Sequence, residues 1–121
     1  FSSWSLRGWL MLEKFGLGFN THLIGLYGGT MAADMAHLAP AKLVPTLQTA
    51  DGTVVGESLA IAETLAENHP DKKMWPTDPV ARATARWFGA EMASSFGQLR
   101  RQCPMQLQNV NKGFSVDAGL K

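Results

Sequence analysis

Two adjacent polar residues, Glu57 and Ser58, stand at the expected start of a helix. The free N–H groups and the dipole at a helix start favour a bound carboxylate. The Ser58 hydroxyl can donate to that carboxylate, and the Glu57 carboxylate can pair with an ammonium group. Together they suit a ligand that ends like an amino acid. The same two residues also suit a plain N-cap without a ligand.

A proline comes shortly before this pair, in the segment Leu43-Val44-Pro45-Thr46-Leu47. Pro45 stands where a strand begins after a loop, which favours a fixed turn or a cis bond. A cis bond would expose the backbone N–H and C=O of Val44 to a ligand, whereas the alternative is an ordinary proline at a strand entry. Lys42 could meet a second carboxylate, although a lone lysine is also typical of a solvated surface.

A serine cluster, Ser2, Ser3 and Ser5, surrounds Trp4 ahead of the first expected helix. A hydroxyl that donates to a thiolate favours the charged form and lowers the thiol pKa. Lowering a free thiol pKa of about 8.5 by about two units requires roughly 2.7 kcal/mol, which one hydroxyl and a helix N-terminus can supply. Helix capping is the alternative role of these serines.

Other chemistries have little support in the sequence. His22, His37 and His69 lack carboxylate or cysteine partners at metal-ligand spacing, so we predict no metal site. The single cysteine, Cys103, permits no internal disulfide and no Cys-x-x-Cys redox motif, and it reads as an incidental thiol. The formal net charge of +1 creates no large field for nucleic acid or an anionic membrane.

The local patterns predict the elements that must position these residues. A serine-capped helix should run to Lys14 and end at Gly16 and Gly18, and a second helix, capped by Ser58, should end near Asn68 before Pro70. Asp51-Gly52 predicts a hairpin with a primed turn. The remaining expectations are a strand at 20–26, a short helix at 30–38, strands at 44–49 and 53–55, and a helix at 80–102 with an apolar surface.

This order of elements indicates an α/β fold with a right-handed crossover in a mixed sheet. A thioredoxin-like domain has the same order with one more strand first, which would lie upstream of Phe1. We expect a ligand-binding domain at residues 1–69, a linker at 70–79 and a partial all-α carboxyl-terminal domain at 80–121. Because the chain starts at Phe1 and not Met, we also expect that it is a fragment or the ordered portion of a longer chain. We predict no membrane span.

The ordered motifs resemble the glutathione transferase family, specifically its serine-type, bacterial zeta-like members. The resemblance covers Ser-Ser-Trp-Ser-Leu-Arg, then Lys-Leu-Val-Pro-Thr-Leu, Asp-Gly and Glu-Ser-Leu-Ala-Ile, and continues through Trp75-Pro76 to about residue 105. It implies a thioredoxin-like glutathione-binding domain whose first strand is missing here, followed by the start of a helical domain.

The resemblance also implies roles for individual residues. Ser2 would be the catalytic serine, with Ser3 as runner-up, and Trp4 stands where zeta-like members have cysteine. Val44, which directly precedes Pro45, would pair through its backbone N–H and C=O with the cysteinyl part of glutathione. Glu57 and Ser58 would hold its γ-glutamyl end, and Lys42 its glycyl carboxylate.

At the level of function, the resemblance implies a cytoplasmic, homodimeric detoxification enzyme. It would activate the glutathione thiol for addition to a small electrophile, with glutathione as cosubstrate and no metal. Two alternatives stay open, a noncatalytic transferase-like binding module and a glutathione-dependent isomerase of the maleylacetoacetate type.

Overall fold

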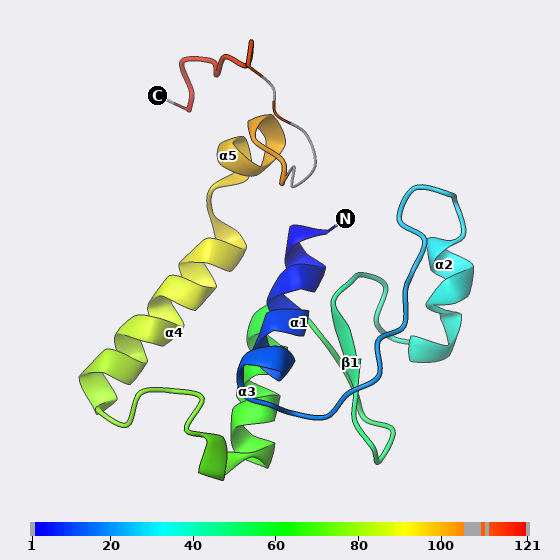
Figure 1. Cartoon of the computed structure of the whole chain (residues 1–121), viewed down its shortest axis with the longest axis vertical. Helices are drawn as coiled ribbons and strands as arrows, with labels where there is room; N and C mark the ends of the chain where they lie inside the picture. The colour runs from blue at the N-terminus through cyan, green and yellow to red at the C-terminus, as the bar shows by residue number, and fades with distance from the viewer. Residues whose placement is uncertain (1, 106–109, 111, 121) are drawn as a thin grey trace.

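The computed structural model describes residues 2–105, 110 and 112–120 of the chain. Two helices, α1 (Ser3–Lys14) and α3 (Ser58–Asn68), lie against each other at its centre. A two-stranded sheet lies on one side of this pair and α4 (Pro79–Ser94) on the other (Figure 1). The α/β class predicted from the sequence is therefore confirmed.

Helix α1 begins and ends where the local signals predict. Ser2 is its N-cap, and the Ser2 hydroxyl oxygen accepts a hydrogen bond from the Ser5 backbone N–H at 3.2 Å. At the other end, Gly16 has a φ of 61°, a left-handed conformation that glycine adopts without steric cost. The N–H groups of Gly16 and Leu17 then bond to the carbonyls of Glu13 and Leu12, which closes the last turn of the helix.

The sheet is an antiparallel hairpin of β1 (Thr46–Gln48) and β2 (Val54–Gly56), in which Leu47 pairs with Val55. The predicted hairpin is thus confirmed. Its turn differs from the predicted primed type, because only Gly52 of the Asp51-Gly52 pair has a positive φ, 89°. The Asp51 carboxylate instead accepts bonds from the Thr53 N–H and the Thr49 hydroxyl, which holds the turn from within.

The predicted strand at residues 20–26 is wrong. This segment contains the apolar residues Leu23, Ile24 and Leu26, but among the described residues it forms no ladder with another strand. Leu23 is 92% exposed, so it is not buried against a core. Apolar residues produce a strand only where a neighbouring strand supplies hydrogen-bond partners. The expected mixed sheet with a crossover is accordingly reduced to the single hairpin.

The segment predicted as a short helix at 30–38 is helical in two pieces, α2 (Met31–Asp34) and the 3₁₀ helix η1 (Ala36–Leu38). Within the described residues, the fully buried hydrophobic side chains are Met35, Ile61 and Leu65. Leu59 and Ala62, which also belong to α3, are half-buried. Two of the three buried side chains therefore lie on one face of α3, and α3 packs against α1, α4 and both strands.

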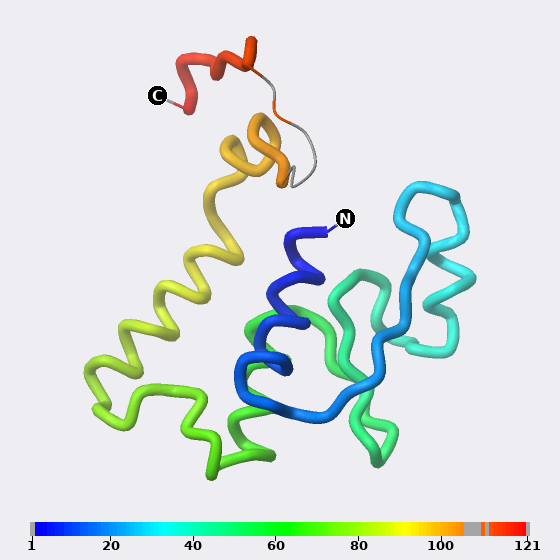
Figure 2. Tube along the Cα trace, in the orientation of Figure 1, coloured from blue at the N-terminus to red at the C-terminus, as the bar shows by residue number. Residues whose placement is uncertain are grey.

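After α3 the chain turns through the 3₁₀ helix η2 (Pro70–Lys72) and returns along α4, a path that Figure 2 follows. Arg86 of α4 donates to both carboxylate oxygens of Glu63 on α3, at 2.6 and 3.0 Å, and Trp75 donates to the same carboxylate at 3.2 Å. The bonds from Arg86 are the main cause that lowers the pKa of Glu63. Because both charged groups are substantially exposed, this pair orients α4 more than it stabilises the fold.

The single long helix predicted at 80–102 is instead two helices, α4 and α5 (Gly97–Gln102). Between them Phe96 takes a left-handed φ of 61°, which ends the helical path. The Arg100 guanidinium reaches back and donates to the carbonyls of Met92 (2.9 Å) and Ser95, so a side chain replaces the helical partners of these carbonyls. The apolar periodicity of residues 80–102 alone does not predict such a break. The tail beyond α5 is described only in part.

None of the helices in the described part of the chain is both long enough and apolar enough to cross a membrane.

Candidate functional site

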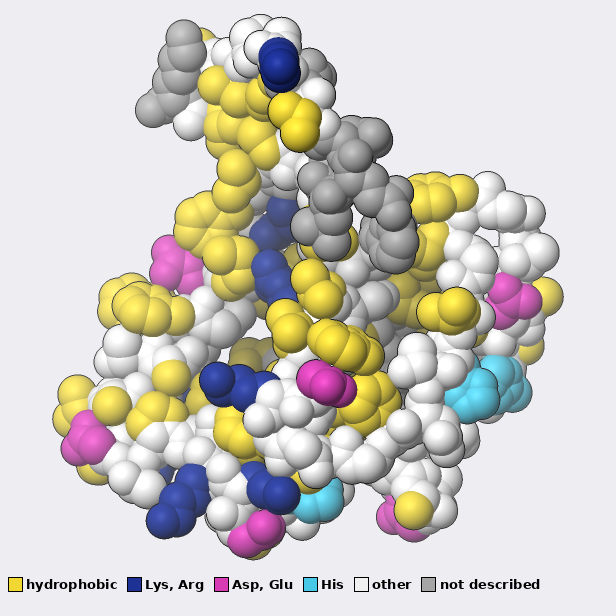
Figure 3. Space-filling model, viewed as in Figure 1, with side chains coloured by type: hydrophobic (Ala, Val, Ile, Leu, Met, Phe, Trp, Pro, Cys, Tyr) yellow, Lys and Arg dark blue, Asp and Glu magenta, His cyan; other side chains and the backbone are white. Residues whose placement is uncertain are grey.

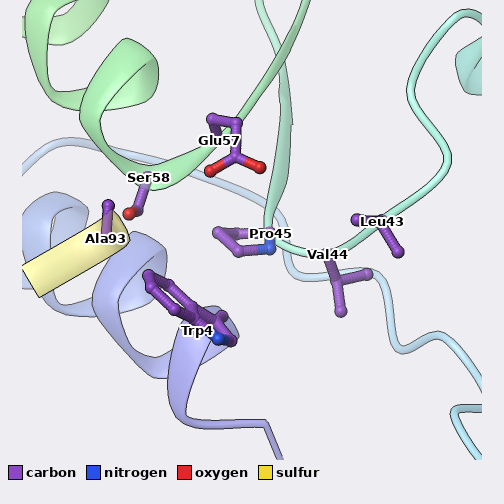
Figure 4. Close-up of a pocket in the computed structure, with 7 residues that line it drawn as sticks. All are labelled: Trp4, Leu43, Val44, Pro45, Glu57, Ser58 and Ala93. Carbon is purple, nitrogen blue, oxygen red and sulfur yellow. The ribbon is translucent and has the colours of Figure 1, made fainter. Parts of the chain in front are cut away.

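A small cavity of about 150 Å³ lies where the start of α1, the start of α3, the Val44-Pro45 loop and α4 come together. Figure 4 shows its lining side chains, with Glu57 and Ser58 on one side and Trp4 across from them. The lining residues are Trp4, Leu43, Val44, Pro45, Glu57, Ser58 and Ala93. Four of the residues predicted from the sequence to bind a ligand therefore line one cavity.

The Val44-Pro45 peptide bond is cis, one of the two outcomes expected from the sequence. Among the described residues, the backbone N–H and C=O of Val44 make no hydrogen bond. The loop is held instead by its neighbours, since the Thr46 hydroxyl donates to the Leu43 carbonyl at 2.7 Å. Val44 thus presents an unused donor and acceptor to the cavity, as an extended peptide ligand would require.

Glu57 occupies an uncommon backbone conformation at the start of α3, with φ 66° and ψ 129°. The prediction that Ser58 caps this helix is wrong, because Glu57 is the N-cap residue and Ser58 is the first helical residue. The sharp turn out of β2 moves the helix start by one position. No side chain among the described residues caps α3. The first backbone N–H groups of α3, at the positive end of the helix dipole, are therefore available to an anion.

The predicted catalytic serines lie on the other side of Trp4. Ser2 and Ser3 line a larger groove of about 890 Å³, and Trp4 lines both this groove and the small cavity. The Ser2 oxygen is used as an acceptor in capping α1, which leaves its hydroxyl hydrogen available to donate. A hydroxyl can therefore cap the helix and activate a ligand at the same time.

Lys42 is not brought into the cavity. Its side chain is exposed, and it is absent from the residues that line either the cavity or the groove. Its contact with a glycyl carboxylate stays a prediction. Conversely, Ala93 lines the cavity and was not foreseen, because a small apolar residue on a later helix carries no chemical signal in the sequence.

Trp4 lines both the cavity and the groove and contacts two arginine side chains, which the sequence did not indicate. The Arg7 guanidinium carbon lies 4.1 Å from the centre of the Trp4 ring, and that of Arg100 lies 5.2 Å from it. The spacing of Trp4 and Arg7 by three residues on a helix could have suggested the first contact. The second contact depends on where α5 lies, which local patterns do not specify.

The described residues contain no group of three or more His, Cys, Asp or Glu side chains arranged to hold a metal ion.

Gly8 of α1 is buried where the helix passes closest to the cis-proline loop, and a Cβ at this position would lie 2.8 Å from the Pro45 Cβ. Gly8→Ala must therefore push α1 and Pro45 apart. We expect overpacking of about 1–3 kcal/mol, against a gain in helix propensity of about 1 kcal/mol, to give a net loss of stability. Because Pro45 lines the cavity, its displacement should change the shape of the cavity. The affinity of the ligand tested below by calorimetry should therefore fall several-fold.

The matched control is Gly97→Ala in α5, where a Cβ would meet no atom within 4 Å. This control should not lower the unfolding midpoint, because it gains helix propensity without a clash, and it should leave the affinity unchanged. An unaltered affinity in Gly8→Ala would contradict the close packing of α1 against the loop.

Comparisons with known proteins agree with this geometry. The family model described as "Glutathione S-transferase, N-terminal domain" matches residues 1–68. A probable maleylacetoacetate isomerase of Caenorhabditis elegans is 36% identical over 113 residues, which cover 93% of this chain and 51% of the relative. The maleylacetoacetate isomerase of Rattus norvegicus is 35% identical over 128 aligned residues, covering 94% of this chain and 58% of the relative.

A third relative, the maleylacetoacetate isomerase of Dictyostelium discoideum, is 36% identical over 85 residues, covering 69% of this chain and 38% of its own length. This chain spans about half the length of the curated relatives that it matches. No solved structure matches it. The family match confirms the predicted thioredoxin-like type of α/β domain. The chain therefore belongs to the glutathione S-transferase family, and its residues 1–68 correspond to the amino-terminal domain of that family.

Proposed function

We propose that this protein binds glutathione and activates its thiol for addition to a small electrophile. The observation that carries the proposal is the convergence on one cavity of the Val44 backbone, which makes no hydrogen bond among the described residues, and the start of α3, which no side chain caps, with Glu57 and Ser58. These groups complement a peptide that has an amino-acid end with an ammonium and a carboxylate. Membership of the glutathione S-transferase family supports the same ligand.

In this proposal each group has one task. The Val44 backbone pairs with the cysteinyl unit, and the start of α3 holds the γ-glutamyl carboxylate through N–H groups and the Ser58 hydroxyl. Glu57 pairs with the ammonium group of the same unit. Ser2, with Ser3 as the alternative, donates to the sulfur, so that the thiol loses its proton to solvent and the thiolate attacks the electrophile.

Direct binding tests the proposal. Titration of the protein with glutathione in a calorimeter should give saturable heat, and the site should accept S-methylglutathione, whose blocked sulfur leaves the other contacts intact. Glycylglycine, which lacks the γ-glutamyl end, should fail to bind. Absence of glutathione binding would refute the proposed function. The same sample, examined by light scattering, measures the predicted homodimer.

A second function is favoured by a specific observation, because the relatives that cover most of this chain are named maleylacetoacetate isomerases. An isomerase would add the thiolate and expel it again, so free thiol would not be consumed. A transferase consumes one thiol for each electrophile, and a noncatalytic binding module would bind glutathione without turnover. Assay of both free thiol and remaining electrophile during the reaction therefore separates the three: a transferase consumes both, an isomerase converts only the electrophile, and a binding module changes neither. A cytoplasmic location and a detoxification role complete the proposal, on the strength of the family resemblance.

A further inference from the structure

The turn of the hairpin contains a chemically reactive pair of residues, Asp51-Gly52. It is the one place in the sequence where glycine directly follows Asp or Asn. The backbone nitrogen of the residue after an Asp can attack the Asp side chain, and glycine, which has no Cβ, hinders this attack least. Both residues are exposed. Figure 3 shows the turn projecting from the molecule at the lower right, where solvent reaches it.

The attack begins an isomerisation that needs no reagent other than water. The Gly52 nitrogen bonds to the side-chain carboxyl carbon of Asp51, and one water leaves, made from the carboxyl hydroxyl and the amide hydrogen. Water then opens the resulting succinimide ring at either carbonyl. Opening at the side-chain carbonyl restores aspartate. Opening at the main-chain carbonyl gives isoaspartate, in which the backbone is longer by one CH₂ group.

In the folded hairpin, Thr49 holds both of the reacting groups. Its hydroxyl donates to the Asp51 carboxylate, which also accepts the Thr53 N–H at 3.1 Å. The Gly52 N–H donates to the Thr49 carbonyl at 2.9 Å, so the hydrogen that must leave is already engaged. The reaction also requires the neutral carboxyl group, whereas the hydrogen bond from Thr49, followed by those from Thr53, lowers the pKa of Asp51. The closed turn therefore opposes the reaction at both groups.

We propose that Asp51 is a site of spontaneous isomerisation to isoaspartate and that Thr49 protects it while the hairpin is closed. The reaction then takes place in the fraction of molecules whose turn is open, and an exposed turn opens at a lower free-energy cost than the whole fold. This inference goes beyond the proposed function and does not depend on it, because its readout is the chemistry of Asp51 itself.

Modification of the turn would reach the candidate site through the two strands. The Thr49 N–H donates to the Thr53 carbonyl at 2.9 Å beside the ladder, and a longer backbone disturbs this bond. Strand β1 begins directly after Pro45 and β2 ends directly before Glu57, and both residues line the cavity. The isoaspartyl form, separated by hydrophobic chromatography, should therefore unfold at a lower urea concentration than the unmodified protein. An equal midpoint would contradict this link.

Ageing of the folded protein at neutral pH and physiological temperature tests the protection. Tryptic digestion and electron-transfer fragmentation then measure isoaspartate at Asp51. Thr49→Val keeps the branched side chain and removes the hydroxyl, so isoaspartate should accumulate several-fold faster than in the wild type. Thr49→Ser retains a hydroxyl and should retain the protection. In guanidinium chloride all three proteins should react fastest and at one common rate, because the turn is no longer formed.

The matched control is Thr30→Val, since the Thr30 hydroxyl donates to the Asp34 carboxylate at 2.9 Å in an exposed hydrogen bond of the same kind. It lies outside the hairpin and should leave the rate at Asp51 unchanged. Equal rates in folded wild type and folded Thr49→Val would overturn the protective role of Thr49. A difference that persisted in guanidinium chloride would refute it too, because the effect would then come from the local sequence alone. Absence of isoaspartate at Asp51 even in the denaturant would disprove the site itself.

Discussion

Ser2→Gly should raise the pKa of the bound glutathione thiol from about 6.5 to about 8.5, the value of a free thiol. At pH 6.5 the thiolate fraction would then fall about 50-fold, and kcat/KM would fall with it. The reason is that the Ser2 hydroxyl donates to the sulfur in the proposed complex and stabilises only its charged form. The thiolate absorbs in the near ultraviolet, so a spectroscopic titration of the complex measures this pKa directly.

Glycine is the informative replacement because Ser2 also caps α1, accepting the Ser5 N–H at 3.2 Å. Loss of an N-cap serine costs about 1 kcal/mol with alanine but only a few tenths with glycine. Ser5→Ala is the matched control, since this serine belongs to the same cluster but lines neither the groove nor the cavity. It should leave the thiol pKa unchanged.

Ser3→Ala decides between the two candidate serines. An unchanged thiol pKa in Ser2→Gly together with a raised one in Ser3→Ala would move the activating role to Ser3. If neither variant altered the thiol pKa, activation by a serine hydroxyl would be disproved for this protein.

Glu57→Gly should change stability and affinity in opposite directions. A residue other than glycine at φ 66° and ψ 129° is strained by about 1–3 kcal/mol, and glycine relieves most of this strain. We therefore expect the free energy of unfolding in urea to rise by about 1 kcal/mol. Affinity for glutathione should fall about tenfold or more, because the ammonium group loses a charge-assisted hydrogen bond of about 1.5–3 kcal/mol.

Two further variants separate the backbone from the side chain. Lys73→Gly relieves a positive φ of 48° at a position that lines neither pocket, so it should raise stability without changing affinity. Glu57→Gln keeps the backbone conformation and removes the charge, so it should lower affinity without a comparable gain in stability. Unchanged glutathione affinity in Glu57→Gly would contradict the role of this carboxylate.

Much of the fold could be predicted because its signals lie within a few residues of each other. Ser2 and Gly16 bound α1 through hydrogen bonds that span one turn, and Gly52 supplies the positive φ of the hairpin turn. These are local preferences of the backbone, which any chain context would express.

The wrong predictions concern features that distant residues decide. The segment at 20–26 has the apolar residues Leu23, Ile24 and Leu26 but, among the described residues, no strand to pair with. The break between α4 and α5 depends on Arg100, which satisfies the carbonyls of Met92 and Ser95 from the following helix. Neither feature can be read from the apolar periodicity of a single segment.

For the candidate site, the sequence by itself determined which chemical groups are present and in what order. The serines before α1, the proline after Val44 and the Glu57-Ser58 pair are all visible in the local sequence. Only the tertiary structure placed Glu57, Ser58 and Val44 around one cavity, excluded Lys42 from it and brought Arg100 beside Trp4. The physical reason is range: caps and turns are set by bonds between near neighbours. The contacts of α1 with α3, with the Pro45 loop and with Arg100 of α5 depend instead on how side chains pack, down to the absence of a Cβ at Gly8.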